Sequence, residues 1–335
     1  MDFYRSRSVP LDVSYFVNNA CDLGCRHCYV GYDTVGRGLS EELWSNVFDD
    51  LIGLGALTFG AVGKEPLVGW TKTQVVLRHL RDRRHAVANL RFGLVTNLTR
   101  LTPEIGRDLD DLMPDYMDVS IDGNRDVHDA LRGKGTYDRT VANLERLSDE
   151  LRQRVFISFT LGAHNASCLP DLLQMMGRLK FGRLLISPYV GPTFGNDLYL
   201  PVAKQVEIAA ELVQKSKTPL ASCSGVHVYV KSDVTTTPEF ARELTRAGLI
   251  DIDRLLVDDY GVLVTEHSLP RNNVVFFNYQ PCDPSFVNAI RITHDGYVVR
   301  CADMFHADAA SRAIGHVRQT GIGDILRKTR MDLAA

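Results

Sequence analysis

The sequence predicts an α/β protein with parallel strands, followed by a smaller α+β region. Strand-like and helix-like segments alternate six times between residues 13 and 216. Successive β-then-α units imply parallel strands joined by right-handed crossovers. After about residue 217 the composition changes to short strand-like runs separated by irregular loops. We therefore expect one domain over residues 1–217 and a second over 218–335.

Each expected element follows from a local pattern. The strands are expected at 13–18, 57–62, 92–96, 116–121, 155–161 and 182–187, and the helices at about 40–53, 71–86, 103–111, 136–153, 167–179 and 202–216. Ser40 before two glutamates and Thr102 before Pro103 are typical N-terminal caps. In the second region, strands are expected at Val226–Val230, Val274–Phe277, Ala289–Ile292 and Tyr297–Arg300. Asp295-Gly296 between the last two predicts a hairpin.

The composition is that of an ordinary globular protein, with 335 residues, 45% of them hydrophobic and 24% charged. A net charge of -3 argues against a polyanionic partner such as nucleic acid. No apolar run approaches the length of a membrane span, and the first 20 residues lack a signal-peptide core. Seven cysteines without an export signal predict a cytoplasmic protein that uses thiols as ligands or reagents.

Residues 21–28, Cys-Asp-Leu-Gly-Cys-Arg-His-Cys, lie just after the first expected strand. Their thiols, on Cys21, Cys25 and Cys28, have CxxxCxxC spacing. Three soft ligands on one short loop suit an iron–sulfur cluster. A cubane cluster has four irons, so three thiols leave one iron open to a small molecule. The alternatives are a zinc site completed by His27, or three unrelated core cysteines.

This loop resembles the signature of the radical S-adenosylmethionine (SAM) superfamily. There the open iron chelates SAM, and reductive cleavage of SAM makes a 5'-deoxyadenosyl radical. The resemblance implies a partial (β/α)6 TIM-like barrel, although a doubly wound sheet fits the periodicity equally well. It also implies a [4Fe-4S] cluster and SAM as cofactors, and an electron donor such as flavodoxin or ferredoxin. In either fold the chemistry belongs at the carboxyl ends of the strands.

Two later stretches extend the resemblance. Gly60 to Pro66 looks like the family's GGEP motif, which binds the SAM amino group, with Lys64 in place of the second Gly. The stretch from Asp118 to Gly133 is similar to the VSIDG…HD…RG run of the SPASM and twitch subgroups, whose Ser and Asp lie near SAM and substrate. Taken alone, the two stretches also fit an ordinary βα turn and a turn-capping Asp. The residues implied near SAM are Tyr29, Gly63, Glu65, Asn97, Ser120, Asp122, Ser158 and Asn165.

A second set of cysteines flanks the expected hairpin. Cys282 and Cys301 form a C-x13-G-x4-C pattern that resembles the opening half of a SPASM domain. No Cys follows Cys301, so the resemblance implies a shortened, twitch-like domain with at most one auxiliary cluster. The alternative is two buried thiols and no second metal. The further ligands would be Cys223 as the third and Cys168, Asp303 or His306 as the fourth, unless one iron is open.

We expect a radical SAM oxidoreductase acting on a carbinol C–H of a sugar-like or aminocyclitol-like small molecule, as in antibiotic biosynthesis. The first strand begins by residue 13, which leaves no room for the extra N-terminal domain of many peptide-modifying relatives. Dehydrogenation to a ketone is favoured, with the auxiliary cluster accepting an electron. Hydrogen donation from Cys168 or Cys223 would give the epimer instead. Peptide maturation, a radical reaction on a sugar nucleotide, and a non-catalytic metal protein are the alternatives.

Overall fold

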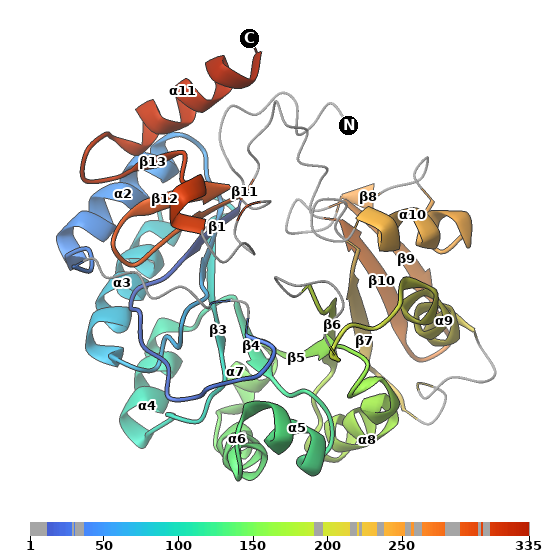
Figure 1. Cartoon of the computed structure of the whole chain (residues 1–335). Helices are drawn as coiled ribbons and strands as arrows, with labels where there is room; N and C mark the ends of the chain where they lie inside the picture. The colour runs from blue at the N-terminus through green and yellow to red at the C-terminus, as the bar shows by residue number, and fades with distance from the viewer. Residues whose placement is uncertain are drawn as a thin grey trace.

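The computed structural model describes residues 12–28, 30, 37–190, 197–214, 220, 223–232, 238–251, 256–257, 263–278, 289–300, 303 and 309–334. Within these residues the strands form one 13-stranded sheet, in the order β13-β12-β11-β1-β2-β3-β4-β5-β6-β7-β10-β9-β8. The sheet curves, and the connecting helices lie on its outer side (Figure 1). The expected partial barrel is therefore present.

Strands β1 to β7 are parallel and follow one another in chain order. They are Asp12–Tyr15 (β1), Thr58–Ala61 (β2), Arg91–Thr96 (β3), Tyr116–Ser120 (β4), Val155–Leu161 (β5), Arg183–Pro188 (β6) and His227–Lys231 (β7). The six strands expected before residue 217 correspond to β1 to β6, with ends that differ by at most three residues. Their carboxyl ends share one edge of the sheet, where the sequence predicts the chemistry.

The helices are Glu41–Gly53 (α2), Trp70–Arg84 (α3), Pro103–Leu112 (α4), Arg125–Arg132 (α5), Thr136–Glu145 (α6), Asp149–Arg152 (α7), Leu169–Leu179 (α8), Val202–Val213 (α9), Pro238–Arg246 (α10) and Ile322–Ala334 (α11). Both predicted caps are confirmed. The Ser40 hydroxyl accepts from the Leu43 amide at 3.2 Å. The Thr102 hydroxyl accepts from the Ile105 amide at the same distance. Each cap satisfies an amide that has no partner within its helix.

The prediction of a single helix over 136–153 is wrong, because the chain forms α6 and α7 there. Ser148 causes the break, since its hydroxyl accepts from the Leu151 amide at 3.2 Å and begins a new helix. The sequence analysis also missed α5, a short helix with only two buried side chains, His128 and Leu131. A helix this short and this polar has a weak apolar periodicity.

The C-terminal strands extend both edges of the same sheet. Asn273–Asn278 (β10) pairs in parallel with β7, and Ala289–Ile292 (β11) pairs in parallel with β1. The antiparallel strands at the edges are Tyr297–Arg300 (β12), Gly315–His316 (β13), Leu263–Ser268 (β9) and Leu256–Val257 (β8). The predicted hairpin is confirmed between β11 and β12, where Gly296 has a φ of +111°. The sheet thus contains strands from both parts of the chain, before and after residue 217. The division into two domains stays a prediction.

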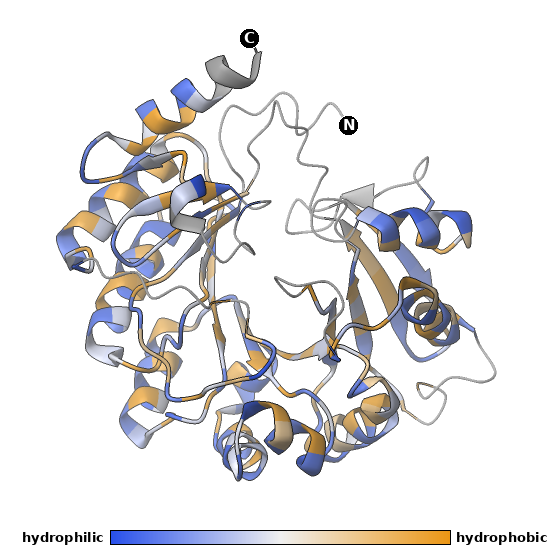
Figure 2. Cartoon of the chain, viewed as in Figure 1, coloured by the Kyte–Doolittle hydropathy of each residue, from blue (hydrophilic) through white to orange (hydrophobic). Residues whose placement is uncertain are grey.

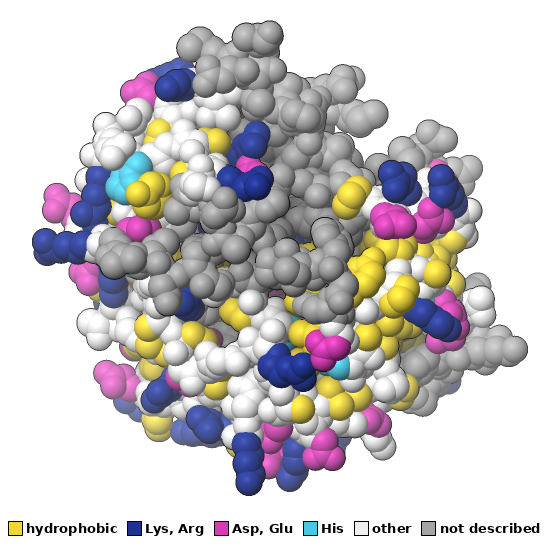
Figure 3. Space-filling view, in the orientation of Figure 1, with side chains coloured by type: hydrophobic (Ala, Val, Ile, Leu, Met, Phe, Trp, Pro, Cys, Tyr) yellow, Lys and Arg dark blue, Asp and Glu magenta, His cyan; other side chains and the backbone are white. Residues whose placement is uncertain are grey.

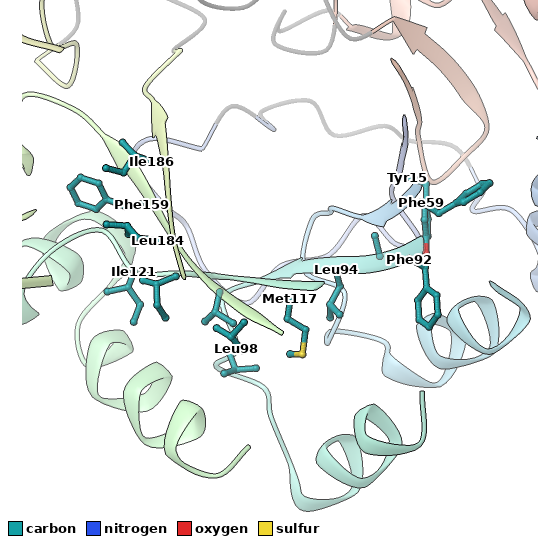
Figure 4. Close-up of a cluster of buried hydrophobic side chains, with 14 of the residues drawn as sticks. Tyr15, Phe59, Phe92, Leu94, Leu98, Met117, Ile121, Phe159, Leu184 and Ile186 are labelled. Atoms are coloured by element: carbon teal, nitrogen blue, oxygen red, sulfur yellow. The ribbon is translucent and has the colours of Figure 1, made fainter. Parts of the chain in front are cut away.

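The hydrophobic core lies between the sheet and the helices that surround it (Figure 4). Near β1 it is aromatic, because the ring of Phe48 packs 4.8 Å from Tyr15 and 5.2 Å from Phe59, centroid to centroid. Trp44 completes this group at 5.5 Å from Phe48. These rings are fully buried and anchor the strand that precedes the cysteine loop.

The helices place apolar residues against the sheet and hydrophilic residues outward (Figure 2). On the face drawn in Figure 3, lysine and arginine are interspersed with aspartate and glutamate over the described surface. Among the described residues, no helix combines the length and hydropathy that a bilayer span requires. The cytoplasmic location stays a prediction.

The inner face of the barrel is polar at several positions. In β4, Met117 and Val119 are fully buried in the core, so Asp118 and Ser120 face the opposite side, toward the barrel interior. Burial raises the pKa of Asp118 to about 7. The same alternation in β1 puts Asp12 on the inner face, and burial raises its pKa to about 6. The interior therefore presents carboxyl groups to any molecule that enters it.

Candidate functional site

The cysteine loop follows β1 at the carboxyl edge of the sheet, and the turns after neighbouring strands hold it. The Glu65 amide donates to the Ala20 carbonyl at 3.0 Å. The Arg26 amide donates to the Leu131 carbonyl of α5 at 2.9 Å. The loop is thus bonded on one side to the turn after β2 and on the other to the helix after β4. This edge is where the sequence predicts the site.

The three thiols of the loop are free and accessible. Cys21 and Cys28 are exposed, and Cys25 is half-buried. Nitrogen donors lie beside two of the sulfurs, with Asn97 Nδ2 at 3.9 Å from Cys21 Sγ and Arg132 Nη1 at 3.9 Å from Cys25 Sγ. Donors beside sulfur favour the thiolate form, which is the form that binds iron.

The pKa values of these thiols indicate what would stabilise their thiolate forms. Burial raises the pKa of Cys25 to about 11, although the positive charge of Arg132 acts in the opposite direction. Burial raises the pKa of Cys21 as well. Thiolates on this loop therefore require positive charge close to the sulfurs, and bound iron supplies it. Three free thiols, two of them beside N–H donors, are the type of donor set that an iron–sulfur cluster requires.

Glu65 joins the turn after β2 to the turn after β3. Its side chain is 1% exposed, and it accepts from the Thr96 hydroxyl at 2.6 Å and from the Asn97 amide at 2.7 Å. The Leu67 amide donates to it at 3.0 Å. Burial raises its pKa to about 7. All of these donors belong to the protein, so the carboxylate shapes the two turns beside the cysteine loop.

Gly63, two residues before Glu65, has no room for a side chain. A Cβ there would lie 2.8 Å from the nearest ring atom of Phe16. The close approach holds the turn after β2 against the end of β1. The glycine of the sequence motif is thus required by packing in this structure.

Asp22 links the cysteine loop to the turn after β3. It accepts from Thr99 Oγ1 at 2.6 Å, from Asn97 Nδ2 at 3.1 Å and from Arg100 Nε at 3.0 Å. The hydrogen bonds from Thr99 and Asn97 hold its pKa below the usual range in spite of burial. Asn97 therefore contacts both Asp22 and Cys21, which places it at the centre of this side of the site.

Asp122, Arg132 and His27 form a second network beside the loop. Asp122 is fully buried and accepts from Arg132 Nε at 2.6 Å and from the Thr160 amide at 2.8 Å. His27 Nε2 lies 3.3 Å from both Asp122 Oδ2 and Arg132 Nη2. Burial lowers the pKa of His27 to about 4, so its ring is neutral at pH 7. These contacts engage Nε2, one of the two ring nitrogens of His27 that could bind zinc.

His128 supports the turn that carries Asp122. Its Nδ1 accepts from the Asp122 amide at 3.2 Å. Burial lowers its pKa to about 4, and its ring packs against Tyr137 with a centroid distance of 5.7 Å. The predicted motif residue thus has a structural task, which is to fix the backbone at Asp122.

The remaining predicted SAM residues occupy different positions. Ser120 and Ser158 are register partners on β4 and β5, and both are half-buried on the inner side. Asn165 is fully buried and binds backbone atoms, donating to the carbonyls of Thr160 and Asp122. Asn165 therefore holds the end of β5, and its proximity to SAM stays a prediction. Tyr29 lies outside the described residues.

Cys168 and Cys223 lie in two different parts of the fold. Cys168 is buried behind the turn after β4, where a Cβ on Gly123 would lie 3.3 Å from its sulfur. Cys223 precedes the amino end of β7, at the opposite edge of the sheet, and its Sγ lies 3.8 Å from the Leu173 carbonyl. Their roles as hydrogen donors or cluster ligands stay predictions.

The structure describes only some of the residues predicted to bind an auxiliary cluster. Cys282, Cys301 and His306 lie outside the described residues. Asp303 is buried and accepts from Arg300 Nε at 2.8 Å, with Arg312 Nη1 at 3.6 Å. Its carboxylate is thus engaged in ion pairs, and the auxiliary cluster stays a prediction.

Sequence reasoning missed three residues of the site. Asp22 was not considered, His27 was weighed only as a zinc ligand, and Arg132 appeared only as part of a quoted motif. The available signal was position, since Asp22 and His27 lie between the cysteines. Arg132 has no local signal, because its contact with Cys25 spans 107 residues.

Comparison with known proteins identifies relatives across most of the chain. The sequence model of the family described as "Radical SAM superfamily" matches residues 15–176. The mycofactocin maturase MftC of Mycolicibacterium smegmatis is 29% identical over 237 residues, covering 68% of this chain and 57% of the relative. Fe-coproporphyrin III synthase of Methanosarcina barkeri is 25% identical over 250 residues, covering 69% and 61%. PqqA peptide cyclase of Granulibacter bethesdensis is 22% identical over 216 residues, covering 63% and 56%.

The fold also matches solved structures. Streptococcus suis SuiB, in a crystal structure with its precursor peptide SuiA, has a TM-score of 0.68 at 13% identity, and the match covers 97% of this chain and 66% of SuiB. The matched region spans 56–61% of the length of the three relatives compared above. The shared fold supports the partial barrel, with the cysteine loop at its carboxyl edge.

Proposed function

Because the chain belongs to the radical SAM superfamily, we propose that it is a radical SAM enzyme that modifies a peptide. The superfamily implies a [4Fe-4S] cluster and SAM, which confirms the predicted cofactors. Cys21, Cys25 and Cys28 hold the cluster. When bound, the two cofactors supply a carbon radical that removes a hydrogen atom from the substrate.

The proposal of a peptide substrate is supported by the names of the similar proteins. Of the proteins compared above, one is named as a peptide cyclase, one as a maturase and one as a synthase of an iron porphyrin, and SuiB was crystallised with a precursor peptide. The sequence-based preference for a sugar-like alcohol has no support among them. Peptide maturation, an alternative in that analysis, has this support. The argument from a missing N-terminal domain falls away, because the chain matches only about three fifths of its relatives' length.

The protein's own residues position the cofactors and the substrate. Glu65 and Asn97 set the shape of the turns beside the cluster loop. Ser120 and Ser158 face the barrel interior from adjacent strands, where a bound molecule meets them. Well-defined turns suit a radical reaction, since an enclosed radical meets the C–H bond of the substrate and not those of the protein.

The interior of the barrel suits a polar chain. Asp12 and Asp118 are on its inner face, as are Lys231 of β7 and Arg291 of β11 by strand alternation. The cation of Lys231 lowers the pKa values of both carboxyl groups, against the effect of burial. Carboxyl and cationic groups can bind the amides and charged side chains of a peptide by hydrogen bonds.

The proposal is tested with anaerobically reconstituted protein and dithionite. SAM cleavage is measured as 5'-deoxyadenosine, with Cys28→Ala as the control that removes a cluster ligand. Peptides encoded by short reading frames beside the gene are compared with a panel of aminoglycosides. We expect a peptide to accelerate 5'-deoxyadenosine formation and to change mass, and the aminoglycosides to do neither. Modification of an aminoglycoside alone would contradict the proposal.

A further inference from the structure

Among the described residues, Arg132 brings a full positive charge to a sulfur of the cysteine loop. Its Nη1 lies 3.9 Å from Cys25 Sγ. Its side chain is only 10% exposed, so solvent screens the charge weakly. The ion pair with Asp122 involves Nε of Arg132, and it leaves unexplained why Nη1 is directed toward the sulfur.

The guanidinium of Arg132 is held in one orientation. Its Nε donates to Asp122 at 2.6 Å, and its Nη2 lies 3.3 Å from His27 Nε2. Asp122 is itself fixed by the Thr160 amide at 2.8 Å. The Thr160 amide therefore fixes the Asp122 carboxylate independently of Arg132. Because the guanidinium is planar, its bond to this fixed carboxylate also sets the direction of Nη1. The orientation toward Cys25 is therefore built into the fold.

The sulfurs of the loop are not equivalent in this respect. Cys21 receives neutral donors, the Asn97 amide group at 3.9 Å and the Leu23 amide at 3.4 Å. In the described part of the chain, the contact recorded for Cys28 Sγ is the Val30 carbonyl at 3.9 Å. Among the described residues, the guanidinium of Arg132 contacts the sulfur of Cys25. The contact is thus asymmetric, since it is made to one thiol of the loop.

We propose that Arg132 raises the reduction potential of the [4Fe-4S] cluster through its contact with Cys25. Reduction adds one electron to the cluster and breaks no bond, so the reduced form carries one more negative charge. A fixed cation and an N–H donor beside a ligating sulfur stabilise that form more than the oxidised form. The negative charge of Asp122 opposes this effect, but Asp122 reaches Cys25 only through the guanidinium of Arg132.

The relative position of the two charges decides the sign. Arg132 Nη1 lies 3.9 Å from Cys25 Sγ, whereas Asp122 contacts the guanidinium at Nε. The pair therefore presents its positive end to the sulfur. Arg132 is a positioning residue for the cluster's charge, since it touches a ligand and neither SAM nor substrate. The inference rests on the cluster and not on the peptide substrate.

The test is a redox titration of the reconstituted holoenzyme without SAM or substrate, followed by electron paramagnetic resonance of the reduced cluster. The variants are Arg132→Gln, which removes the charge, and Arg132→Lys, which keeps it. The matched control is Arg26→Gln. Arg26 lies on the same loop, but its guanidinium is 55% exposed and pairs with Asp197 at 2.8 Å.

We expect Arg132→Gln to have a more negative midpoint potential than the parent. The difference should exceed the spread among replicate titrations of the parent. Arg132→Lys should lie between Arg132→Gln and the parent, and Arg26→Gln should match the parent. Iron content is measured for each protein, so that loss of the cluster is seen directly. If Arg132→Gln does not retain iron, Arg132→Met, which also removes the charge, takes its place. A parent-like potential in an iron-bearing variant that lacks the charge would overturn the proposal, whatever the substrate is.

Discussion

The buried pair of Asp122 and Arg132 allows a quantitative prediction. Asp122→Asn keeps the shape of the side chain and an oxygen for the Thr160 amide, but it removes the charge opposite Arg132. Asp122 is fully buried, and its ion pair and hydrogen bonds lower its pKa to about 2 from 3.8. That shift corresponds to about 2 kcal/mol of native-state stability, at about 1.4 kcal/mol per pH unit. Arg132 would also remain buried without its partner.

Breaking a buried pair on one side costs about 3–5 kcal/mol. We therefore expect Asp122→Asn to lower the free energy of unfolding by about 3 kcal/mol. The assay is urea unfolding of the metal-free chain at pH 7, followed by circular dichroism. The matched control is Asp197→Asn, which breaks the exposed pair with Arg26, whose side chains are 55% and 72% exposed. An exposed pair contributes about 0–1 kcal/mol.

The pH dependence of this difference has a definite sign. The folded-state pKa of Asp122 lies below its unfolded value, so its contribution is complete above about pH 4 and is lost as the pH falls through about 2. The gap between the parent and Asp122→Asn should narrow over that window. Replacing Arg132 as well, in Asp122→Asn/Arg132→Gln, should recover part of the loss. A loss no larger than that of Asp197→Asn would refute the reasoning.

Three further predictions concern packing and metal content. Gly63→Ala should lower the free energy of unfolding by about 1–3 kcal/mol in urea, because its Cβ would lie 2.8 Å from the Phe16 ring. The control is Gly24→Ala, which should change this free energy little, because nothing lies within 4 Å of its Cβ. Equal losses of stability in the two variants would contradict the packing account. Phe48→Ala should cost about 3–5 kcal/mol in the same assay, because the ring is fully buried, whereas Val75→Ala at the surface should change stability by less than about 0.5 kcal/mol. Iron analysis should give about eight irons per chain if the auxiliary cluster exists and about four if it does not. The triple alanine variant of the cysteine loop should lose about four irons, and an unchanged iron content would exclude the loop as the cluster site.

Sequence reasoning located the strands better than the helices. The buried parallel strands read as short apolar runs, and six of them lie within three residues of their expected bounds. Helix boundaries depend on side-chain hydrogen bonds that periodicity does not report. Ser148 divided one expected helix in two in this way, and Asn124 begins α5 by accepting from the Val127 amide at 3.2 Å.

The same contrast holds at the site. Cys21, Cys25 and Cys28 could be found from the sequence because all three thiols lie within eight residues. Glu65 and Asn97 were reachable too, since each follows a predicted strand. Their mutual contact, at 2.7 Å, was not, because it joins turns that only the sheet brings together.

The sequence alone indicated which cofactors this protein uses, since the thiol spacing and the residues after each strand resemble those of cluster-binding and SAM-binding proteins. The tertiary structure decided how that chemistry is supported. Parallel strands bring their carboxyl ends to one edge, and α5 folds back so that Arg132 reaches a thiol 107 residues earlier in the chain. A long-range contact of a single charged side chain leaves no periodic pattern in a sequence. It becomes visible only when the buried carboxylate that orients the charge is in place.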